Sequence, residues 1–183
     1  MNVITTAIAD VKLVEPKVFG DSRGHFLESY NAARFAEAVG ASPAFIQDNQ
    51  SFSTRGVLRG LHYQVIRPQA KLVRCVQGEI YDVAVDLRQS SPTFGRYVGA
   101  MLTAENHRQL WIPVGFAHGF YVVSPTAVVL YKTTDYYSPD GERAILWNDP
   151  DLAIAWPMDA GSEPSVSDKD LKALAFRAAD KFA

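Results

Sequence analysis

The chain has 183 residues, of which 48% are hydrophobic and 21% are charged, and its formal net charge is −2. This length suits one domain with a substantial core, so we expect residues 1–183 to form a single domain. The near-neutral charge gives no overall attraction to nucleic acid or to a membrane surface, so an anionic ligand would have to meet a local group of Arg and Lys.

The cysteine content and the hydrophobic runs indicate the compartment. Cys75 is the only cysteine, so no intrachain disulfide can form, which fits a reducing cytoplasm. It lies in an apolar run, and we interpret it as a small core residue. The first ten residues do not read as a signal peptide, and no apolar run approaches the ~20 residues that span a bilayer. We therefore expect a soluble, cytoplasmic protein.

Short segments with a β-type pattern, separated by turn residues, dominate the first 150 positions. Between them, Asn31 is a candidate N-cap for a short helix that ends at Gly40. The pair Gln77-Gly78 between two β-type runs predicts a hairpin. Helical spacing of apolar residues predicts a closing helix over 171–182. The expected strands cover residues 11–14, 25–30, 45–52, 57–64, 71–76, 79–86, 97–102, 109–112, 120–123 and 127–134. Such a series predicts a β-sandwich or barrel.

Two segments carry candidate chemistry, namely Arg-Gly-Leu-His-Tyr-Gln (59–64) and Pro-Val-Gly-Phe-Ala-His-Gly-Phe (113–120). Together they resemble the two signatures of the cupin superfamily, which implies a mainly β fold, a double-stranded β-helix or jelly roll. Where metal-binding cupins have a second His and a Glu, this chain has Gln64 and Lys71. A protonated Lys repels a divalent cation and offers no lone pair. His62 and His118 are too few ligands for a stable site, so we expect no metal.

The remaining polar groups suit removal of a proton next to a carbonyl group. An imidazole such as His62 can accept a proton near neutral pH, and strand alternation places it on the face opposite Leu61 and Tyr63. Arg59 and Lys71 could hold the developing enolate oxygen. Tyr131 on a late strand could donate a proton to the other face of the substrate. Taken singly, His62 could also be a structural histidine and Tyr131 a core aromatic.

The two segments belong to an ordered set of motifs. The set comprises DSRGHFLE (21–28), QDNQS (47–51), GVLRGLHYQ (56–64), QAKLV (69–73), SPTFG (91–95), PVGFAHGF (113–120), YKTTDYY (131–137), WNDP (147–150), WP (156–157) and SDKD (167–170). Over nearly the whole chain, this set resembles the dTDP-4-dehydrorhamnose 3,5-epimerase family of metal-free, cupin-like enzymes.

The resemblance implies a reaction and a role for each site residue. The implied substrate is dTDP-4-dehydro-6-deoxyglucose, converted without a cofactor to dTDP-4-dehydro-L-rhamnose on the route to rhamnose and cell-surface polysaccharide. The implied enzyme is a homodimer in which one subunit contributes to its neighbour's site. His62 would be the general base, paired with Asp170 or alternatively Asp168, and Tyr131 would be the general acid. The implied binding residues are Arg59, Lys71 and His118 at the sugar, and Arg23, Glu28, Gln47, Asn49 and Tyr137 at the nucleotide.

Three alternatives stay open at the level of sequence. Relatives of this family act at C3 only, at C5 only or at both positions, and the combination of His62, Tyr131 and an Asp favours both. A metal-dependent cupin isomerase or oxygenase would need a bound metal, against which Gln64 and Lys71 argue. A non-catalytic nucleotide-sugar binder would be expected to lack the base or the acid.

Overall fold

The computed structural model describes residues 1–183 and contains many short strands and little helix. The helices are α1 (Ala32–Val39) and α2 (Asp168–Leu171), and a 3₁₀ turn, η1, spans Pro139–Gly141. The strands are β1 (Asn2–Thr5), β2 (Lys12–Glu15), β3 (Val18–Asp21), β4 (Gly24–Leu27), β5 (Gln47–Thr54), β6 (Leu58–Gln64), β7 (Lys71–Gln77), β8 (Glu79–Asp86), β9 (Tyr97–Thr103), β10 (Gln109–Ile112), β11 (Phe116–Val122), β12 (Thr126–Thr133) and β13 (Glu142–Ala144).

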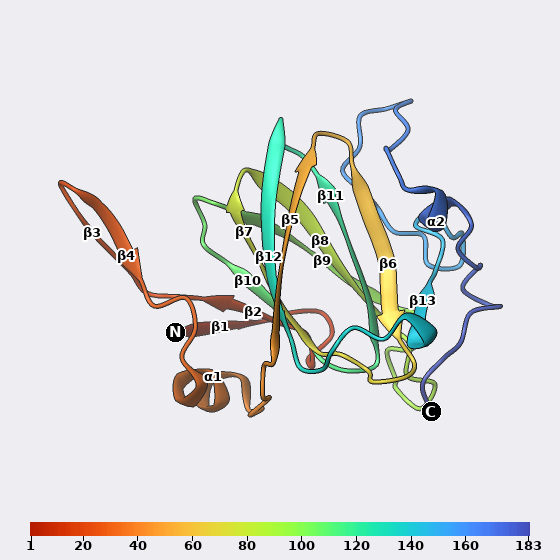
Figure 1. Cartoon of the computed structure of the whole chain (residues 1–183), viewed down its shortest axis with the longest axis horizontal. Coiled ribbons are helices and arrows are strands. Elements are labelled where there is room, and N and C mark those ends of the chain that lie inside the picture. The colour runs from red at the N-terminus through yellow and green to blue at the C-terminus, as the bar shows by residue number, and fades with distance from the viewer.

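Two antiparallel sheets form the body of the molecule (Figure 1). One has the strand order β1-β2-β10-β7-β12-β5 and the other has the order β13-β6-β11-β8-β9. Side chains from both sheets meet in a shared core, with Val73 and Val129 from the first sheet against Ile80, Ala84 and Phe120 from the second. Burial of each such large apolar side chain stabilises the fold by roughly 1.5–3 kcal/mol. The expected mainly β jelly roll is therefore confirmed.

The outer face of each sheet is covered by a different segment. Helix α1 packs on the six-stranded sheet, where Phe35 meets Trp111 edge-on with ring centroids 5.3 Å apart. Its predicted caps are present: the Asn31 side chain accepts the Arg34 N–H, and Gly40 ends the helix with φ 75°. The irregular C-terminal segment covers the five-stranded sheet, in a cluster that includes Leu61.

The third sheet consists of only β3 and β4, and Figure 1 shows this hairpin as an arm that projects away from the body. Every residue of β3 is exposed. Phe19 and Phe26 are 52% and 70% exposed, which leaves two aromatic side chains of the arm largely in solvent. No helix of the structure is long and apolar enough to cross a membrane.

The predicted hairpin at Gln77-Gly78 is wrong, because β7 and β8 belong to different sheets. Only Gly78 separates the two strands, whereas the tight hairpins that such a dipeptide predicts have two loop residues. Gly78 has φ 76°, and a Cβ there would lie 2.0 Å from the Thr126 carbonyl oxygen. The chain therefore crosses from one sheet to the other at a corner that only glycine fits.

The predicted closing helix over 171–182 is also wrong, since helix α2 ends at Leu171. Leu171 and Leu174 are 60% and 50% exposed, so the apolar stripe expected of that helix is not buried. A short helix without a buried face is marginal in water. The segment is held instead by bridges between Leu174 and Ile145 and between Phe182 and Arg88.

Strand limits differ from the prediction mainly at β11. It starts at Phe116, four residues before the expected segment 120–123, so His118 and Gly119 lie inside the strand. Strands β1, β3 and β13 were not expected. Each has only three or four residues, too few for a clear alternating pattern.

Candidate functional site

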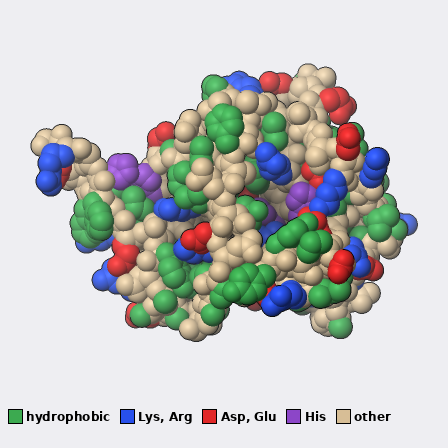
Figure 2. Space-filling model, in the orientation of Figure 1, with side chains coloured by type: hydrophobic (Ala, Val, Ile, Leu, Met, Phe, Trp, Pro, Cys, Tyr) green, Lys and Arg blue, Asp and Glu red, His purple; other side chains and the backbone are tan.

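A cavity of about 250 Å³ opens between the two sheets, lined from β5, β6, β7, β11, β12, β13 and the segment leading into β13. Figure 2 shows basic and histidine side chains gathered around a hollow between β5 and β6. The predicted site residues that line it are Gln47, Asn49, Arg59, His62, Lys71, His118, Tyr131 and Tyr137. Folding thus brings together residues from five strands and one loop.

Strands β6 and β11 approach each other closely where their motifs meet. A Cβ at Gly60 would lie 2.5 Å from the Gly119 Cα, and a Cβ at Gly119 would lie 2.7 Å from the Arg59 carbonyl oxygen. The pairing register shifts between His118 and Phe120, as in a β-bulge. Gly60, two residues before His62, and Gly119, directly after His118, therefore allow the close contact that sets the two histidines on one wall.

His62 is bonded to an aspartate that arrives from far along the chain. Its Nε2 lies 2.5 Å from Oδ1 of Asp170, which is only 2% exposed. Ser167 caps the short helix α2 by accepting the Asp170 N–H. Asp168 is exposed, so the structure pairs Asp170 rather than Asp168 with the imidazole.

The environment of Asp170 favours its charged form. Burial alone would raise the pKa of this carboxyl group, but the hydrogen bond and charge of His62, with the Ser167 hydroxyl and the Gly60 N–H, hold it below its usual value. A carboxylate in this position orients the ring and stabilises an imidazolium if His62 takes up a proton.

Lys71 and His118 lie deeper, beside the same wall. The Lys71 ammonium donates to the His62 carbonyl oxygen at 3.4 Å, and burial lowers the pKa of Lys71 to about 8 against the opposing charges of Asp82 and Glu142. His118 Nε2 lies 2.7 Å from Oδ1 of the buried Asp82. Burial also lowers the pKa of His118. The wall therefore offers a cation and a neutral imidazole.

Tyr131 lies on β12 and therefore on the opposite sheet from His62. It is partly buried, and its neighbour across the β5–β12 pairing is Asn49. Burial raises the pKa of Tyr131, and the charge of Arg59 opposes this change. The phenol consequently stays protonated at neutral pH and can donate.

Arg59 lies at the open side of the cavity, on β6. Its Nε donates to the Ser53 hydroxyl at 3.0 Å and its Nη2 donates to the Phe52 carbonyl oxygen at 3.3 Å. These two bonds to β5 fix the guanidinium while leaving the side chain exposed. A fixed, accessible guanidinium suits an anionic ligand group such as a phosphate.

A chain of hydrogen bonds defines the outer end of the cavity. Gln47 Nε2 donates to Asn49 Oδ1 at 2.9 Å, and Gln47 Oε1 accepts the Tyr137 N–H at 3.2 Å. The Tyr137 hydroxyl donates to Glu142 at 2.7 Å, and Glu142 is also paired with Lys169. The Tyr137 ring itself is 54% exposed and is available for stacking.

The sequence reasoning missed Glu142 and Lys169. Burial alone would raise the pKa of Glu142, but its bonds to Lys169 and Tyr137 lower it below the usual value. Glu142 lies on β13, a three-residue strand without a recognisable pattern. The only sequence signal near Glu142 is the motif YKTTDYY, which contains its hydrogen-bond partner Tyr137.

Gln64 holds a loop in place. Its Nε2 donates to the Arg67 and Tyr136 carbonyl oxygens at 2.8 and 3.2 Å, and its Oε1 accepts the Ser138 N–H at 3.0 Å. Both ends of the amide are thus used by backbone groups. The residue that replaces a cupin metal ligand here fixes the loop that carries Tyr137.

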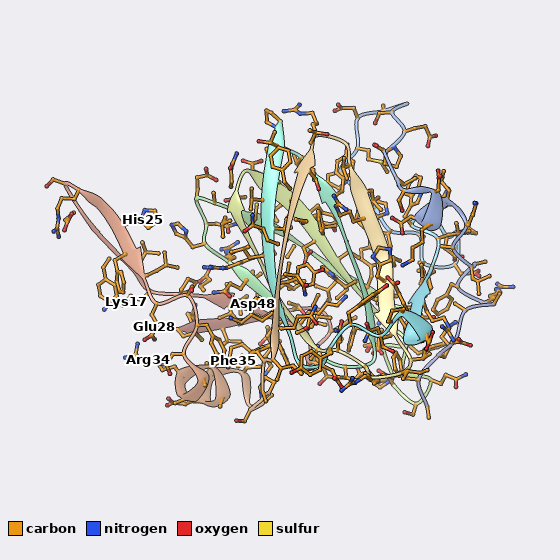
Figure 3. The ribbon with its side chains drawn as sticks, viewed as in Figure 1. Lys17, His25, Glu28, Arg34, Phe35 and Asp48 are labelled. Carbon is orange, nitrogen blue, oxygen red and sulfur yellow. The ribbon has the colours of Figure 1, made fainter.

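Arg23 and Glu28 are the predicted substrate-binding residues that the structure leaves outside the cavity. Arg23, at the turn of the arm, pairs with Asp21 at 2.6 Å and its side chain is 87% exposed. Glu28 accepts from Arg34 at 3.0 Å. Figure 3 shows Glu28 and Arg34 side by side near the base of the arm, on the side of the molecule remote from β6. Neither residue reaches the cavity of its own chain.

Comparisons with known proteins agree with this geometry. The family model described as dTDP-4-dehydrorhamnose 3,5-epimerase matches residues 5–178. A protein of that name from Pseudomonas aeruginosa is 58% identical over 182 residues, covering 100% of this chain and 99% of the relative.

Solved structures are similar over nearly the whole chain. A dTDP-6-deoxy-D-glucose-3,5-epimerase from Legionella pneumophila, in complex with dTDP-4-keto-L-rhamnose, has a TM-score of 0.94 and 52% identity, with 98% of this chain and 94% of that chain covered. A 3'-monoepimerase from Streptomyces bikiniensis, in complex with dTDP-quinovose, has a TM-score of 0.88 and 35% identity, with 97% and 88% covered.

Proposed function

This chain belongs to the dTDP-4-dehydrorhamnose 3,5-epimerase family, and from that premise we propose that it epimerises dTDP-4-dehydro-6-deoxyglucose at C3 and C5. The observation that carries the proposal is the placement of His62 and Tyr131 on opposite sheets, facing one cavity. Inversion of a carbon centre needs a base on one face of the sugar ring and an acid on the other.

The first step is removal of a proton by His62. The C4 ketone of the substrate acidifies the C–H bonds at C3 and C5, because the resulting carbanion is an enolate. His62 takes the proton, and the carboxylate of Asp170 at 2.5 Å stabilises the imidazolium. General base catalysis of this kind contributes roughly 10²–10⁴-fold.

The enolate oxygen then needs fixed positive charge or hydrogen-bond donors. Lys71 is buried beside His62 and supplies an ammonium group to the wall of the cavity. Arg59 and His118 line the same cavity. One preorganised donor at a developing oxyanion is worth roughly 3 kcal/mol.

The second step is delivery of a proton to the opposite face. Tyr131 gives its phenolic proton to the carbanion carbon, and the C4 carbonyl re-forms with the carbon inverted. The site ends with one more proton on His62 and one fewer on Tyr131, which exchange with solvent restores. Two such rounds, at C3 and at C5, convert the sugar to the L-rhamno configuration without any redox step.

In this proposal, the nucleotide binds at the outer end of the cavity, where Gln47, Asn49 and Tyr137 lie. Arg23 and Glu28 complete the site from a second copy of the chain. Arg23 lies on the exposed arm and Glu28 lies at its base, which supports this dimeric arrangement, since the arm also carries the exposed Phe19 and Phe26. Contacts of the arm with a partner subunit would cover both rings.

The donor set supports a reaction without a metal ion. At the two positions where metal-binding cupins carry further ligands, Gln64 bonds to backbone groups and Lys71 is a cation. His62 and His118 each use Nε2 for an aspartate. The ketone already present in the substrate acidifies the C–H bonds at C3 and C5, which is the activation that a Lewis acid or redox cofactor would otherwise provide.

The test is incubation of the protein with dTDP-4-dehydro-6-deoxyglucose in heavy water, with the ring protons followed by NMR. The proposal expects loss of both the H3 and H5 signals and formation of the L-rhamno product. Loss of one signal alone would make the protein a single-position epimerase. Retention of both signals would overturn the proposed substrate. A His62→Ala variant, which lacks the base, serves as the inactive control.

A further inference from the structure

Asp82 on β8 is a fully buried carboxylate behind the cavity wall. Its Oδ1 meets His118 Nε2 at 2.7 Å, while its Oδ2 is buried without any hydrogen-bond partner in the protein. Burial of a charged oxygen without a partner is costly, and substitution by an apolar residue of similar size is often neutral or stabilising. Stability alone therefore does not account for an aspartate at this position.

Lys71 is a buried cation whose charge interacts with that of Asp82. Lys71 is itself buried, and its one hydrogen bond is the long one to the His62 carbonyl oxygen. No direct ion pair joins the Lys71 ammonium to a carboxylate within 4.0 Å. Asp82 and Lys71 thus act on each other through space in a poorly hydrated interior, where such interactions are strong.

The other groups around Lys71 come from each neighbouring element. His62 on β6 and His118 on β11 share the wall, Glu142 approaches from β13, and Arg59 and Tyr131 face the same cavity. Of the two carboxylates, Asp82 has the larger effect on Lys71. Glu142 already forms an ion pair with Lys169, whereas Asp82 forms no direct ion pair with a Lys or Arg. Asp82 is therefore the carboxylate available as a counter-ion for Lys71.

We propose that Asp82 is a positioning residue for the epimerisation, which keeps Lys71 protonated where the enolate oxygen forms and holds His118 as the neutral tautomer with its proton on Nε2. The inference rests on the proposed function, because the enolate is the intermediate that the Lys71 ammonium group would stabilise. Asp82 does not touch the substrate in this arrangement. It acts only through the other two side chains.

The proposal predicts that activity falls at alkaline pH. Burial lowers the pKa of Lys71 to about 8 even with the opposing charge of Asp82 in place. Activity that requires the ammonium form should therefore fall as pH rises through about 8. Loss of the Asp82 charge removes an interaction that raises the pKa of Lys71, so the same fall should occur at lower pH. Tyr131 does not account for a fall near this pH, because its pKa is raised from 10.0.

The test is the isosteric variant Asp82→Asn, whose side-chain oxygen can still accept from His118. We expect kcat at pH 8 to fall about fivefold with KM changed less than about threefold, because the alkaline limb of kcat should move down by about one pH unit from about 8. Asp149→Asn is the matched control, because Asp149 is equally buried but accepts only the N–H groups of Asp151 and Phe176. That variant should keep the wild-type limb.

Unchanged kcat and an unchanged alkaline limb in Asp82→Asn would overturn the inference. Absence of deuterium exchange in the wild-type protein would instead overturn the proposed function, so the two failures are distinguishable. A measurement on the wild-type protein covers the case in which the variant does not fold. With ¹⁵N-labelled histidine, we expect the His118 ring to be the neutral Nε2–H tautomer at pH 7. An Nδ1–H tautomer or an imidazolium would overturn the proposal.

Discussion

His62 and His118 lie directly opposite each other in the antiparallel pairing of β6 with β11, and each bonds through Nε2 to a different buried aspartate. The partners are Asp170 at 2.5 Å and Asp82 at 2.7 Å. Directly opposed residues share one face of a sheet, with Cβ atoms roughly 4.5–5.5 Å apart. One wall of the cavity therefore presents two histidine–aspartate pairs side by side.

The two pairs differ in their access to solvent. The His62 side chain is 32% exposed and that of His118 is 7% exposed. Burial lowers the pKa of His118, with the adjacent charges of Lys71 and His62 acting in the same direction and Asp82 in the opposite one. His118 is thus suited to remain neutral, whereas His62 can take a proton from the substrate and pass it to water. This difference supports His62 as the base.

Substitution of Tyr131 by Phe should separate proton removal from inversion. Conversion to product should fall roughly 10²–10⁴-fold, because the proton donor on the opposite sheet is lost. Deuterium should still enter the unconverted substrate, since His62 can remove a proton and return a deuteron on the same face. Product formation is followed by NMR in heavy water, and label in the recovered substrate by mass spectrometry.

Tyr136→Phe is the control for this experiment. Tyr136 is exposed and does not line the cavity, so loss of its hydroxyl should leave both rates unchanged. Conversion by Tyr131→Phe at nearly the wild-type rate would exclude Tyr131 as the acid. Loss of label together with loss of conversion would instead mean that Tyr131 is needed for proton removal as well.

Glu142→Gln should weaken binding more than it slows the reaction. The carboxylate accepts the Tyr137 hydroxyl at 2.7 Å and pairs with Lys169, so its neutralisation loosens both groups at the outer end of the cavity. A charge-assisted hydrogen bond is worth roughly 1.5–3 kcal/mol, which predicts a rise in KM of about tenfold or more with a smaller change in kcat. Steady-state kinetics with the dTDP-sugar measure both values.

The matched control is Glu37→Gln on the exposed face of α1, which removes the same charge far from the cavity. Its KM should equal that of the wild type. A fall in kcat for Glu142→Gln with KM unchanged would contradict a role in binding and would move Glu142 to the reacting end of the site.

The local sequence pattern was sufficient to predict the orientation of residues on long, clearly alternating strands. His62 could be placed inward because Leu61 and Tyr63 alternate with it, and both belong to the outer cluster. The caps at Asn31 and Gly40 were readable because capping depends on residues only a few positions apart. Tyr131 could be named as a candidate, but its opposition to His62 follows only from the assignment of β6 and β12 to different sheets.

Long-range partners could not be read from pattern alone. Asp170 is 108 positions from His62, and only family resemblance connected the two residues. In the sequence, Asp82 looks like an ordinary polar residue in a strand. Its proposed role is apparent only from the hydrogen bond with His118, which joins the neighbouring strands β8 and β11. The error at Gly78 has the same origin, because a dipeptide typical of a hairpin cannot reveal that its flanking strands join different sheets.

Asp86 should make the fold sensitive to acid. Burial alone would raise its pKa, but bonds from Arg88, Ser91 and Thr93 lower it from 3.8 to about 2. Because the folded-state pKa is depressed, the group stabilises the fold above its unfolded value and loses that contribution as pH falls from about 4 towards 2. The shift corresponds to about 2 kcal/mol at neutral pH. Urea unfolding across this pH range measures the loss.

The variant Asp86→Asn should unfold about 2 kcal/mol more easily at pH 7 and should show a smaller decline between pH 4 and 2. Asp48→Asn is the control, since Asp48 pairs with Lys132 at the exposed surface. Surface pairs contribute roughly 0–1 kcal/mol. If Asp86→Asn retained the full acid sensitivity of the wild type, other carboxylates would have to account for it.

Subunit mixing can test whether the arm serves a neighbouring cavity. Arg23→Ala and His62→Ala should each lose activity when purified alone. In a heterodimer of the two, one cavity combines His62 from the first chain with Arg23 from the arm of the second. Co-expression with different tags should therefore restore activity, with about a quarter of all sites complete when the chains pair at random.

The matched control is co-expression of His62→Ala with Tyr131→Phe. Both of these residues line the cavity of their own chain, so every heterodimer would contain two incomplete sites and no activity should return. If Arg23 acted within its own subunit, the first mixture would behave like the control, because neither of its cavities would then be complete. Recovery in the first mixture and not in the second is expected only if the exposed arm of one subunit reaches the cavity of the other.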